Sequence, residues 1–317
     1  MQAMSWHPSA TIELLQQRAQ LIAKIRQFFT QRAYLEVETP IMARYGTTDV
    51  YLSNIKALFR GEAYNLQTSP EYHMKRLLAA GSGPIFQLAR VFRDDELGRW
   101  HNPEFSLLEW YQLGIDHHAL MDEMDLLLHF LMDAKPMIRK TYQQAFIEIC
   151  GLDPFSAGLE QLQILLRAHG LDKVLLADEK DCDQYLFLLM SHVIEPALAK
   201  EKAPVALYHF PASQASLAKI TEGVAERFEV YFQGVELANG FHELTDATAQ
   251  AKRFAQDQTV RLEKGLTAVE ADHYLLDALE HGIPACSGVA LGVDRLLALI
   301  LKQPGIDKIM SFDFSRA

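Results

Sequence analysis

The sequence is poor in cysteine, in positive charge and in long apolar runs, and each shortage excludes a class of protein. Its three cysteines, Cys150, Cys182 and Cys286, are too far apart for a zinc motif or a disulfide framework. A formal net charge of −11 argues against a surface built mainly for the nucleic-acid backbone, which requires a basic stripe. The longest apolar runs, such as residues 296–301, are far too short to span a bilayer, so no membrane association is expected.

The N-terminus also lacks the basic start and apolar stretch of a signal peptide, and we expect a cytoplasmic protein. Hydrophobic residues make up 49% of the chain, enough for a large core. A charged fraction of 22% without low-complexity blocks argues against disorder. Because no repeat or flexible linker interrupts the sequence, we expect a single domain over residues 1–317, with residues 150–225 partly a helical insertion.

Hydrophobic periodicity predicts an α+β protein. Apolar residues at helical spacing predict a long amphipathic helix over residues 11–33. Further helices are expected over residues 71–81, 117–133, parts of 156–200, 258–266 and 271–282, and from about 294 onward. Strands are expected over residues 34–42, 84–92, 106–113, 205–210, 227–233, 235–241 and 286–292. Because the strands follow in antiparallel runs with helices around them, we expect an antiparallel β-sheet flanked by helices and not a doubly wound parallel sheet.

Residues 92–111, FRDDELGRWHNPEFSLLEWY, combine charged and aromatic side chains on one predicted hairpin. Arg93 ends an apolar strand, and Glu109 and Tyr111 alternate on the returning strand, so that both face the same side. The connection adds donors for an anionic ligand and a ring for stacking, at His101, Asn102 and Phe105. This set suits a nucleotide together with an amine-bearing substrate, and a solvated hairpin laced with ion pairs is the alternative.

Two further carboxylates lie near a predicted hairpin turn at Gln233-Gly234. With that turn, Glu236 pairs with Tyr231 across the hairpin, and Glu229 lies on the same face. Two carboxylates on one face can hold Mg²⁺, which prefers oxygen ligands and shares them with phosphates. A solvated strand edge is the alternative.

The same segment continues as ELANGFHEL, which places Asn239 and Glu243 among apolar residues. An uncompensated charge is costly there, so a cationic partner is expected beside Glu243. By contrast, His117 and His118 have no further residue at metal-ligand spacing, and surface histidines are expected.

The segment GVALGVDRLL, with glycines at 288 and 292, predicts a strand that runs into a helix at Asp294-Arg295. A helix N-terminus favours anions, and the planar guanidinium of Arg295 suits a phosphate group. An ordinary turn with a surface arginine is the alternative.

Three of these segments resemble the three motifs of class II aminoacyl-tRNA synthetases. VETPIM (residues 37–42), FRDDELGRWHNPEF (92–105) and GVALGVDR (288–295) correspond to motifs one, two and three. TSPEYHMKRLL (68–78) and ELANGFHELTD (236–246) are similar to the lysyl branch. No anticodon-binding domain is expected before motif one, and YHFPASQASLA (208–218) resembles the elongation factor P–(R)-β-lysine ligase family.

The resemblance implies the class II catalytic fold and a role for each matching residue. Arg93 would grip the α-phosphate of ATP, and Arg295 would hold the γ-phosphate with His101 nearby. Glu229 and Glu236 would bind Mg²⁺. The other ATP-binding residues would be Asp94, Asp95, Asn102, Phe105, Leu237 and Gly292. The amino-acid substrate would meet Ser69, Pro70 and Glu71 at one end and Tyr111 and Glu243 at the other, with Glu109, Asn239 and Ala290 close by.

Two residues depart from the lysyl pattern. Asp95 stands where a glutamate is common, so the adenine contact falls to a shorter side chain or to Glu96. Ala290 stands where lysyl-tRNA synthetases usually carry glycine, and we hypothesise that its methyl group reshapes the pocket toward a β-amino acid.

The implied function is activation of (R)-β-lysine, or lysine, by Mg·ATP, followed by transfer to a lysine of elongation factor P. The family also implies a homodimer with residues 11–33 and 37–42 at its interface. One alternative is a minimal synthetase that charges tRNA, although tRNA binding is not expected of so acidic a chain. Another is a non-catalytic, amino-acid-sensing paralogue, which would not need Arg93, Arg295, Glu229 and Glu236 together.

Overall fold

A computed structural model describes residues 6–94, 97–176 and 178–317 of the chain. The main sheet has nine strands among the described residues, and a small sheet has three. The main sheet runs in the order β1 (Leu35–Glu36), β5 (Ile85–Phe92), β6 (Glu104–Leu113), β12 (Cys286–Gly292), β11 (Val235–His242), β10 (Val224–Phe232), β8 (Val205–Pro211) and β7 (Ile138–Thr141). The remaining strand, β9 (Ile220–Thr221), pairs with β10. Only the outer pairs β1–β5 and β7–β8 are parallel, which confirms the predicted antiparallel sheet.

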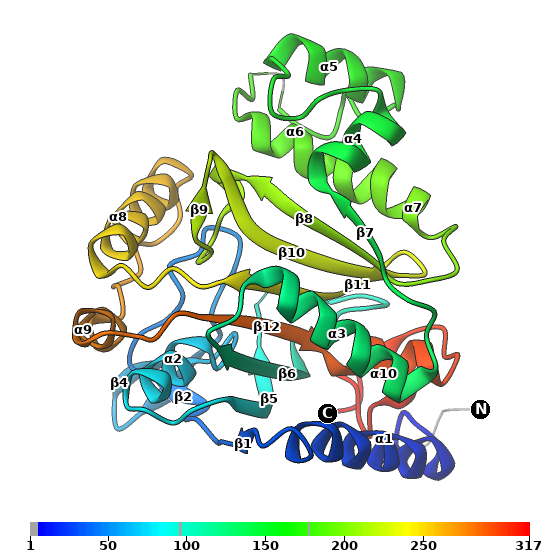
Figure 1. Cartoon of the computed structure of the whole chain (residues 1–317), viewed down its shortest axis with the longest axis vertical. Coiled ribbons are helices and arrows are strands. Elements are labelled where there is room, and N and C mark those ends of the chain that lie inside the picture. The colour runs from blue at the N-terminus through cyan, green and yellow to red at the C-terminus, as the bar shows by residue number, and fades with distance from the viewer. Residues whose placement is uncertain (1–5, 95–96, 177) are drawn as a thin grey trace.

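Helices flank this sheet, as expected for an α+β protein (Figure 1). They are α1 (Ile12–Thr30), α2 (Glu71–Ala79), α3 (His117–Met132), α4 (Tyr142–Cys150), α5 (Leu159–Ala168), α6 (Cys182–Leu189), α7 (Glu195–Leu198), α8 (Ala247–Glu263), α9 (His273–His281) and α10 (Val293–Ile300). A π-helical turn joins α6 to α7 at Met190–Ile194, and 3₁₀ turns lie at Ala212–Gln214 and Ile306–Ile309. In the described part of the chain, no helix is long and apolar enough to cross a membrane.

Two sequence predictions were wrong in extent, and one hairpin was not predicted. The strand expected over residues 34–42 is reduced to β1 and to β2 (Met42–Ala43), because Pro40 between them has no N–H to donate to a ladder. The helix expected over 258–266 overlaps α8 only at residues 258–263. Helix α8 begins earlier, after the N-cap residue Asp246, whose side chain accepts a hydrogen bond from Ala249 N at 2.7 Å. The hairpin of β3 (Lys56–Phe59) and β4 (Glu62–Leu66), which pairs with β2 in the small sheet, was not predicted.

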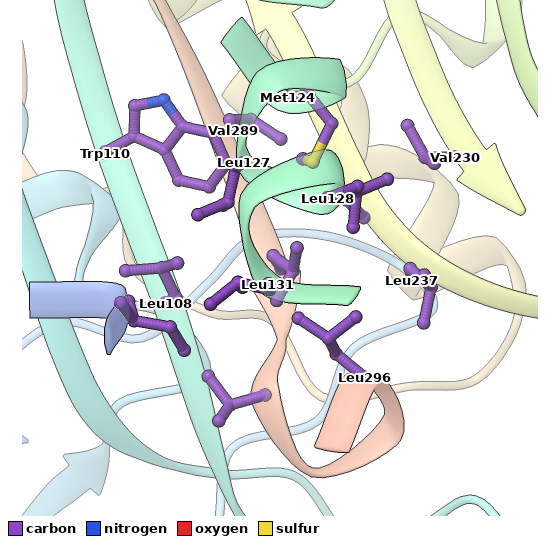
Figure 2. Close-up of a cluster of buried hydrophobic side chains, with 14 of the residues drawn as sticks. Leu108, Trp110, Met124, Leu127, Leu128, Leu131, Val230, Leu237, Val289 and Leu296 are labelled. Atoms are coloured by element: carbon purple, nitrogen blue, oxygen red, sulfur yellow. The ribbon is translucent and has the colours of Figure 1, made fainter. Parts of the chain in front are cut away.

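The largest core lies between the sheet and helices α1, α3 and α10. In Figure 2, Leu108 and Trp110 of β6 meet Met124, Leu127, Leu128 and Leu131 of α3, with Val230, Leu237, Val289 and Leu296 around them. These side chains are at most 6% exposed. Burial of each leucine-sized group contributes roughly 1.5–3 kcal/mol. Because side chains alternate along a strand, the residues that pack in this core determine which residues of each strand point to the opposite face of the sheet.

A second apolar cluster joins helices α4–α7 to β8 and β10. Its members include Phe146, Leu189, Ile194, Leu207 and Tyr231, each at most 2% exposed. The helices lie between β7 and β8 in the chain and stand above the edge of the main sheet (Figure 1). They bring side chains from residues 182–198 toward β10.

Strand register places the predicted site residues on the face opposite to α3. Since Leu108 and Trp110 face the core, Glu109 and Tyr111 face away from it. Glu109 pairs with Ala290, and Tyr111 pairs with Gly288. On the next strand Asn239 also pairs with Ala290, so a continuous polar surface crosses β6, β12 and β11.

Candidate active site

A short hydrogen-bonded chain connects the start of α2 to β6. Ser69 Oγ donates to Glu109 Oε2 at 2.6 Å, and Tyr111 Oη donates to Glu109 Oε1 at 2.6 Å. Ser69 Oγ also accepts from the backbone N–H of Glu71 at 3.0 Å. Both oxygens of a buried carboxylate are thereby held in place, and Pro70 positions this turn as the residue preceding α2.

The cation expected beside Glu243 comes from the chain itself. Lys75, which is 2% exposed, places its Nζ 2.6 Å from Glu243 Oε2 and 2.7 Å from Glu71 Oε1. Although burial opposes it, the two carboxylates raise the pKa of Lys75, which stays charged. The need for a counter-ion at Glu243 was predicted correctly, but it does not by itself require a substrate amine.

The single positive charge of Lys75 is not enough to neutralise the three carboxylates of this pocket, which belong to Glu71, Glu109 and Glu243. Burial raises the pKa of Glu109 to about 7, with the Glu71 carboxylate adding to the effect. Burial raises the pKa of Glu243 to about 8, although Lys75 acts in the opposite direction. Uncompensated negative charge at a buried site favours a cationic ligand.

The two substrate ends expected from the sequence lie together. Glu71 and Glu243 were expected at opposite ends of the substrate, yet both carboxylates contact the Nζ atom of Lys75. The lysine was missed although its position four residues after Glu71 on a predicted helix indicates an ion pair. Glu71, Lys75 and Glu243 therefore form one charged group.

Small residues on β12 leave room for this group. A Cβ on Gly288 would lie 2.2 Å from Tyr111 Cε1 and 2.7 Å from Glu243 Oε1. Ala290, one step along the same face, packs beside Leu107 and Ala89. Asn239 opposite it has a buried Oδ1 that finds no hydrogen-bond partner among the described residues. An orphaned acceptor facing this surface is consistent with a ligand that donates hydrogen bonds there.

Arg295 forms the other end of the site, at the start of α10. It donates to the carbonyl oxygens of Glu236 and Trp100 at 3.0 and 3.1 Å. Its Nη2 lies 2.7 Å from His101 Nε2, so the structure brings together the two residues expected at one phosphate group. The predicted strand-to-helix junction is confirmed, with Gly292 as the residue before α10.

Arg93 and Phe105 face each other across the predicted hairpin. The guanidinium carbon of Arg93 lies 5.1 Å from the centre of the Phe105 ring. Asp94, just beyond, is exposed, and its backbone N–H donates to Ser53 O at 3.0 Å. Asp95 and Glu96 lie outside the described residues, so the adenine contact expected of them stays a prediction.

Asn102 and Leu237 are held by the protein's own contacts. Asn102 Nδ2 donates to Glu104 O at 2.7 Å, and its Oδ1 accepts from Phe314 N at 3.0 Å. The Leu237 side chain belongs to the main core. In this conformation Asn102 anchors the loop, and Leu237 presents only its backbone to the site.

The predicted carboxylate pair lies on one face of the β10–β11 hairpin. Tyr231 pairs with Glu236 and Phe232 with Val235, which confirms the two-residue turn at Gln233-Gly234. A register shift beside Val230 was not predicted. Glu229 forms an ion pair with Arg227 and accepts a hydrogen bond from Tyr231 Oη.

A third carboxylate that sequence reasoning missed joins this pair. Burial raises the pKa of Glu195 on α7 to about 7, with the charges of Glu236 and Glu229 adding to the effect. Burial and Glu229 likewise raise the pKa of Glu236, while nearby arginines act in the opposite direction. Three crowded carboxylates form an oxygen-rich donor set that suits Mg²⁺. Only folding of the 142–198 segment brings Glu195 here, which is why no local motif indicates it.

A cavity of about 530 Å³ opens beside these groups. Its lining includes Ser69 and Glu71 before and at the start of α2, and Arg227 of β10, the ion-pair partner of Glu229. Asp49 and Asp257 add carboxylates to its wall. The cavity therefore borders the turn at Ser69–Glu71 and reaches β10 only at Arg227.

This fold and site define a class of ATP-using synthetases. A family model described as tRNA synthetases class II (D, K and N) matches residues 2–316, and the chain belongs to this family.

Relatives named elongation factor P–(R)-β-lysine ligase cover nearly its whole length. The Vibrio cholerae relative is 50% identical over 321 residues, 98% of each chain. The relatives from Pasteurella multocida and Salmonella typhi are each 50% identical over 322 and 323 residues, 99% of this chain and 98% of theirs. The resemblance expected from the motifs is confirmed.

Proposed function

We propose that this chain activates (R)-β-lysine with ATP and transfers the β-lysyl group to a lysine side chain of elongation factor P. The observation that carries the proposal is the buried pocket in which Glu71, Glu109 and Glu243 face a single lysine. A substrate with ammonium groups supplies the missing positive charge. The names of the relatives supply the amino acid and the acceptor protein.

In the first step, a carboxylate oxygen of the amino acid attacks the α-phosphorus of ATP, and pyrophosphate leaves as the β-lysyl adenylate forms. Arg93 stabilises the negative charge at the reacting phosphate, and Arg295 with His101 holds the terminal phosphate. Glu229 and Glu236, with Glu195 beside them, would hold Mg²⁺, whose charge offsets that of the phosphate oxygens. Catalysis consists mainly of positioning and charge neutralisation.

In the second step, the neutral amine of the acceptor lysine attacks the adenylate carbonyl. An amide bond forms, AMP leaves, and the attacking nitrogen loses a proton. The cavity beside Ser69 and Glu71 gives this side chain a route to the adenylate, and its carboxylates attract a cationic group. We place this reaction in the cytoplasm, where ATP and translation factors meet.

The decisive experiment is intact mass spectrometry of elongation factor P after incubation with the enzyme, Mg·ATP and (R)-β-lysine. A gain of one lysyl unit that requires ATP supports the proposal. The matched control is Arg93→Ala, which should form no adenylate in pyrophosphate exchange. Adenylate formation without any gain in mass would refute the acceptor, and charging of tRNA would then be measured.

The role of Ala290 in substrate choice is tested by Ala290→Gly. Removing the methyl group should lower the preference for β-lysine over α-lysine by about 10-fold, since one methyl group in a pocket discriminates by roughly 1–3 kcal/mol. Pyrophosphate exchange with each amino acid measures the ratio. An unchanged ratio of kcat/KM values would remove Ala290 from the specificity argument.

We also propose a homodimer. The apolar stripe of α1 is used within the chain, because Leu21, Ile25, Phe28 and Phe29 are buried in its own core. The segment after α1 instead leaves Leu35, Ile41 and Met42 at least 40% exposed. Apolar groups gathered on one exposed segment favour a contact between copies, and light scattering of the purified chain measures the mass in solution.

A further inference from the structure

A group of histidines lies across the main sheet from the proposed active site. His117 and His118 begin α3, His209 lies near the end of β8, and His242 ends β11. Glu226 on β10 accepts a hydrogen bond from His242. Because Arg227 and Glu243 face the active site, their neighbours Glu226 and His242 face the side that α3 covers. The group thus lies outside the proposed active site.

The geometry of three of these rings matches a metal site. Ligand nitrogens of His117, His118 and His209 all lie within 4.8 Å of one another. The ring centroid of His117 lies 4.2 Å from that of His118 and 5.1 Å from that of His209. Zinc–nitrogen bonds of about 2.0–2.1 Å put tetrahedral ligands roughly 3.4 Å apart, so closure on an ion needs ring movements of only about an ångström.

His117 has unsatisfied ring nitrogens, which points to a missing ligand. It is 3% exposed, and neither Nδ1 nor Nε2 has a hydrogen-bond partner within the described ranges. A neutral imidazole has one donor and one acceptor, and leaving both unpaired in a protein interior costs free energy. The expectation of surface histidines at 117 and 118 was therefore wrong for His117, because folding brings His209 and Glu226 to it.

The electrostatic state of the rings also suits metal binding. Burial, together with the neighbouring His118 and His209 rings, lowers the pKa of His117 to about 4. Burial likewise lowers the pKa of His209. Neutral imidazoles keep a lone pair for a metal ion, whereas protonated ones do not. His118 and His209 are partly exposed, which leaves a path from solvent.

We propose that His117, His118 and His209 bind one divalent ion of the zinc type. His117 Nδ1 lies 4.0 Å from Glu226 Oε2, so His117 binds the ion through Nε2 and turns Nδ1–H toward this carboxylate. A carboxylate behind a ligating histidine orients its ring and strengthens its bond to the metal. His242 fixes Glu226 from the other side. The ion ties the start of α3 to β8 and the β10–β11 hairpin.

The experiment uses the full chain without a histidine tag, freed of metal by a chelator and then titrated with Zn²⁺. Excess Mg²⁺ is kept present so that the carboxylates of the active site are occupied. One Zn²⁺ per chain is expected, and Co²⁺ in its place should give the visible absorption of a four-coordinate site. Zn²⁺ should also raise the melting temperature, because it binds only the folded chain.

Three variants decide where the ion binds. His118→Gln changes a partly exposed ligand and should abolish stoichiometric Zn²⁺ binding without unfolding the chain. Glu226→Gln should weaken binding by about 10–100-fold, as loss of an orienting carboxylate does elsewhere. His273→Gln, at a histidine whose side chain is 60% exposed, is the matched control and should leave binding unchanged.

The proposal is overturned if the wild-type chain binds no Zn²⁺ at micromolar concentrations. It is equally overturned if His118→Gln binds as well as the wild type, or if Glu236→Gln removes the ion instead. Ligase activity plays no part in these readouts, so the outcome is independent of the proposed reaction.

Discussion

At the scale of single residues, Lys75 sets the charge of the pocket formed by Glu71, Glu109 and Glu243. Its contacts with Glu71 and Glu243 are buried, so neither water nor salt screens them strongly. The lysine holds two carboxylates close together and leaves the pocket short of positive charge. Its role is positioning, since it shapes the groups expected to contact the substrate.

Lys75→Met leaves two buried carboxylates facing each other without a counter-ion. We expect a loss of about 3–5 kcal/mol in the free energy of unfolding, the usual effect of breaking a buried pair. Urea denaturation measures it. In a double-mutant cycle with Glu243→Gln, the two changes should be non-additive by roughly 0.5–3 kcal/mol, and simple additivity would mean that the contact contributes no coupling.

The raised pKa values of Glu109 and Glu243 predict how activity depends on pH. These carboxyls ionise near 7 and 8, and an ammonium substrate binds best when both are charged. kcat/KM for the amino acid in pyrophosphate exchange should therefore rise as the pH increases from 6 to about 8.5. Glu109→Gln should remove the lower inflection; a flat profile in the wild type would contradict the assignment.

The same two carboxyls give the free energy of unfolding a pH dependence opposite to that of activity. Each has a folded-state pKa above the ordinary value of 4.5, so the unfolded chain releases these protons first as the pH rises. Their contribution to the free energy of unfolding is complete below about 4.5 and decreases up to about 8. Without substrate, this pocket thus becomes less stable over the pH range in which its affinity for a cation increases.

At the scale of elements, strand β12 shows that the site requires a glycine, which leaves space for neighbouring side chains. Gly288 faces Tyr111 and Glu243, and Gly292 ends the same strand before α10. Only the first of them is crowded by the protein itself. A Cβ on Gly292 would meet its nearest atom, Arg295 Cδ, at 3.6 Å.

Gly288→Ala should therefore displace the Tyr111 ring. We expect destabilisation of about 1–3 kcal/mol, as for other overpacked cores, together with a large loss of amino-acid activation. Thermal unfolding and pyrophosphate exchange measure the two effects. Gly292→Ala is the matched control and should keep the wild-type stability, so any activity that it loses reports on the close approach of ATP.

Helix α7 contributes to the acidic hairpin from a distant part of the chain. Glu195→Gln should raise the Mg²⁺ concentration needed for half-maximal activity by about 10-fold, because the carboxylate lies beside the proposed ligands. KM for the amino acid should stay unchanged, since the amino-acid pocket is elsewhere. Glu201→Gln, an exposed site shortly after α7, serves as the control. Equal Mg²⁺ dependence in both variants would exclude a role for Glu195.

At the scale of the whole molecule, local sequence pattern correctly predicted which residues share a face of a strand. It did not predict which side chains from distant segments contact one another. Alternation along β6 correctly placed Glu109 with Tyr111, and the Gln233-Gly234 turn correctly set Glu236 against Tyr231. These relations depend on residues that are close in sequence.

The contacts that were missed join distant segments. Lys75 meets Glu243 across 168 residues, Glu195 reaches the hairpin only through the packing of α4–α7, and His209 meets His117 only because β8 lies beside β10. A periodicity argument describes one element at a time, so it cannot indicate which side chains two elements bring together. The match of residues 2–316 confirms the family that the motifs indicated, whereas these contacts are visible only in the folded structure.

The single lysine among three carboxylates also has a consequence for the amino acids that the proposed pocket would reject. A neutral side chain of the same length would fill the space but would leave buried carboxylates without a counter-charge or a hydrogen-bond donor. Sites built around such groups reject analogues that lack the donor by factors of about 10⁴–10⁵, far more than a missing methylene achieves. If the pocket binds the ammonium groups of (R)-β-lysine as proposed, its charge balance alone disfavours activation of the abundant apolar amino acids.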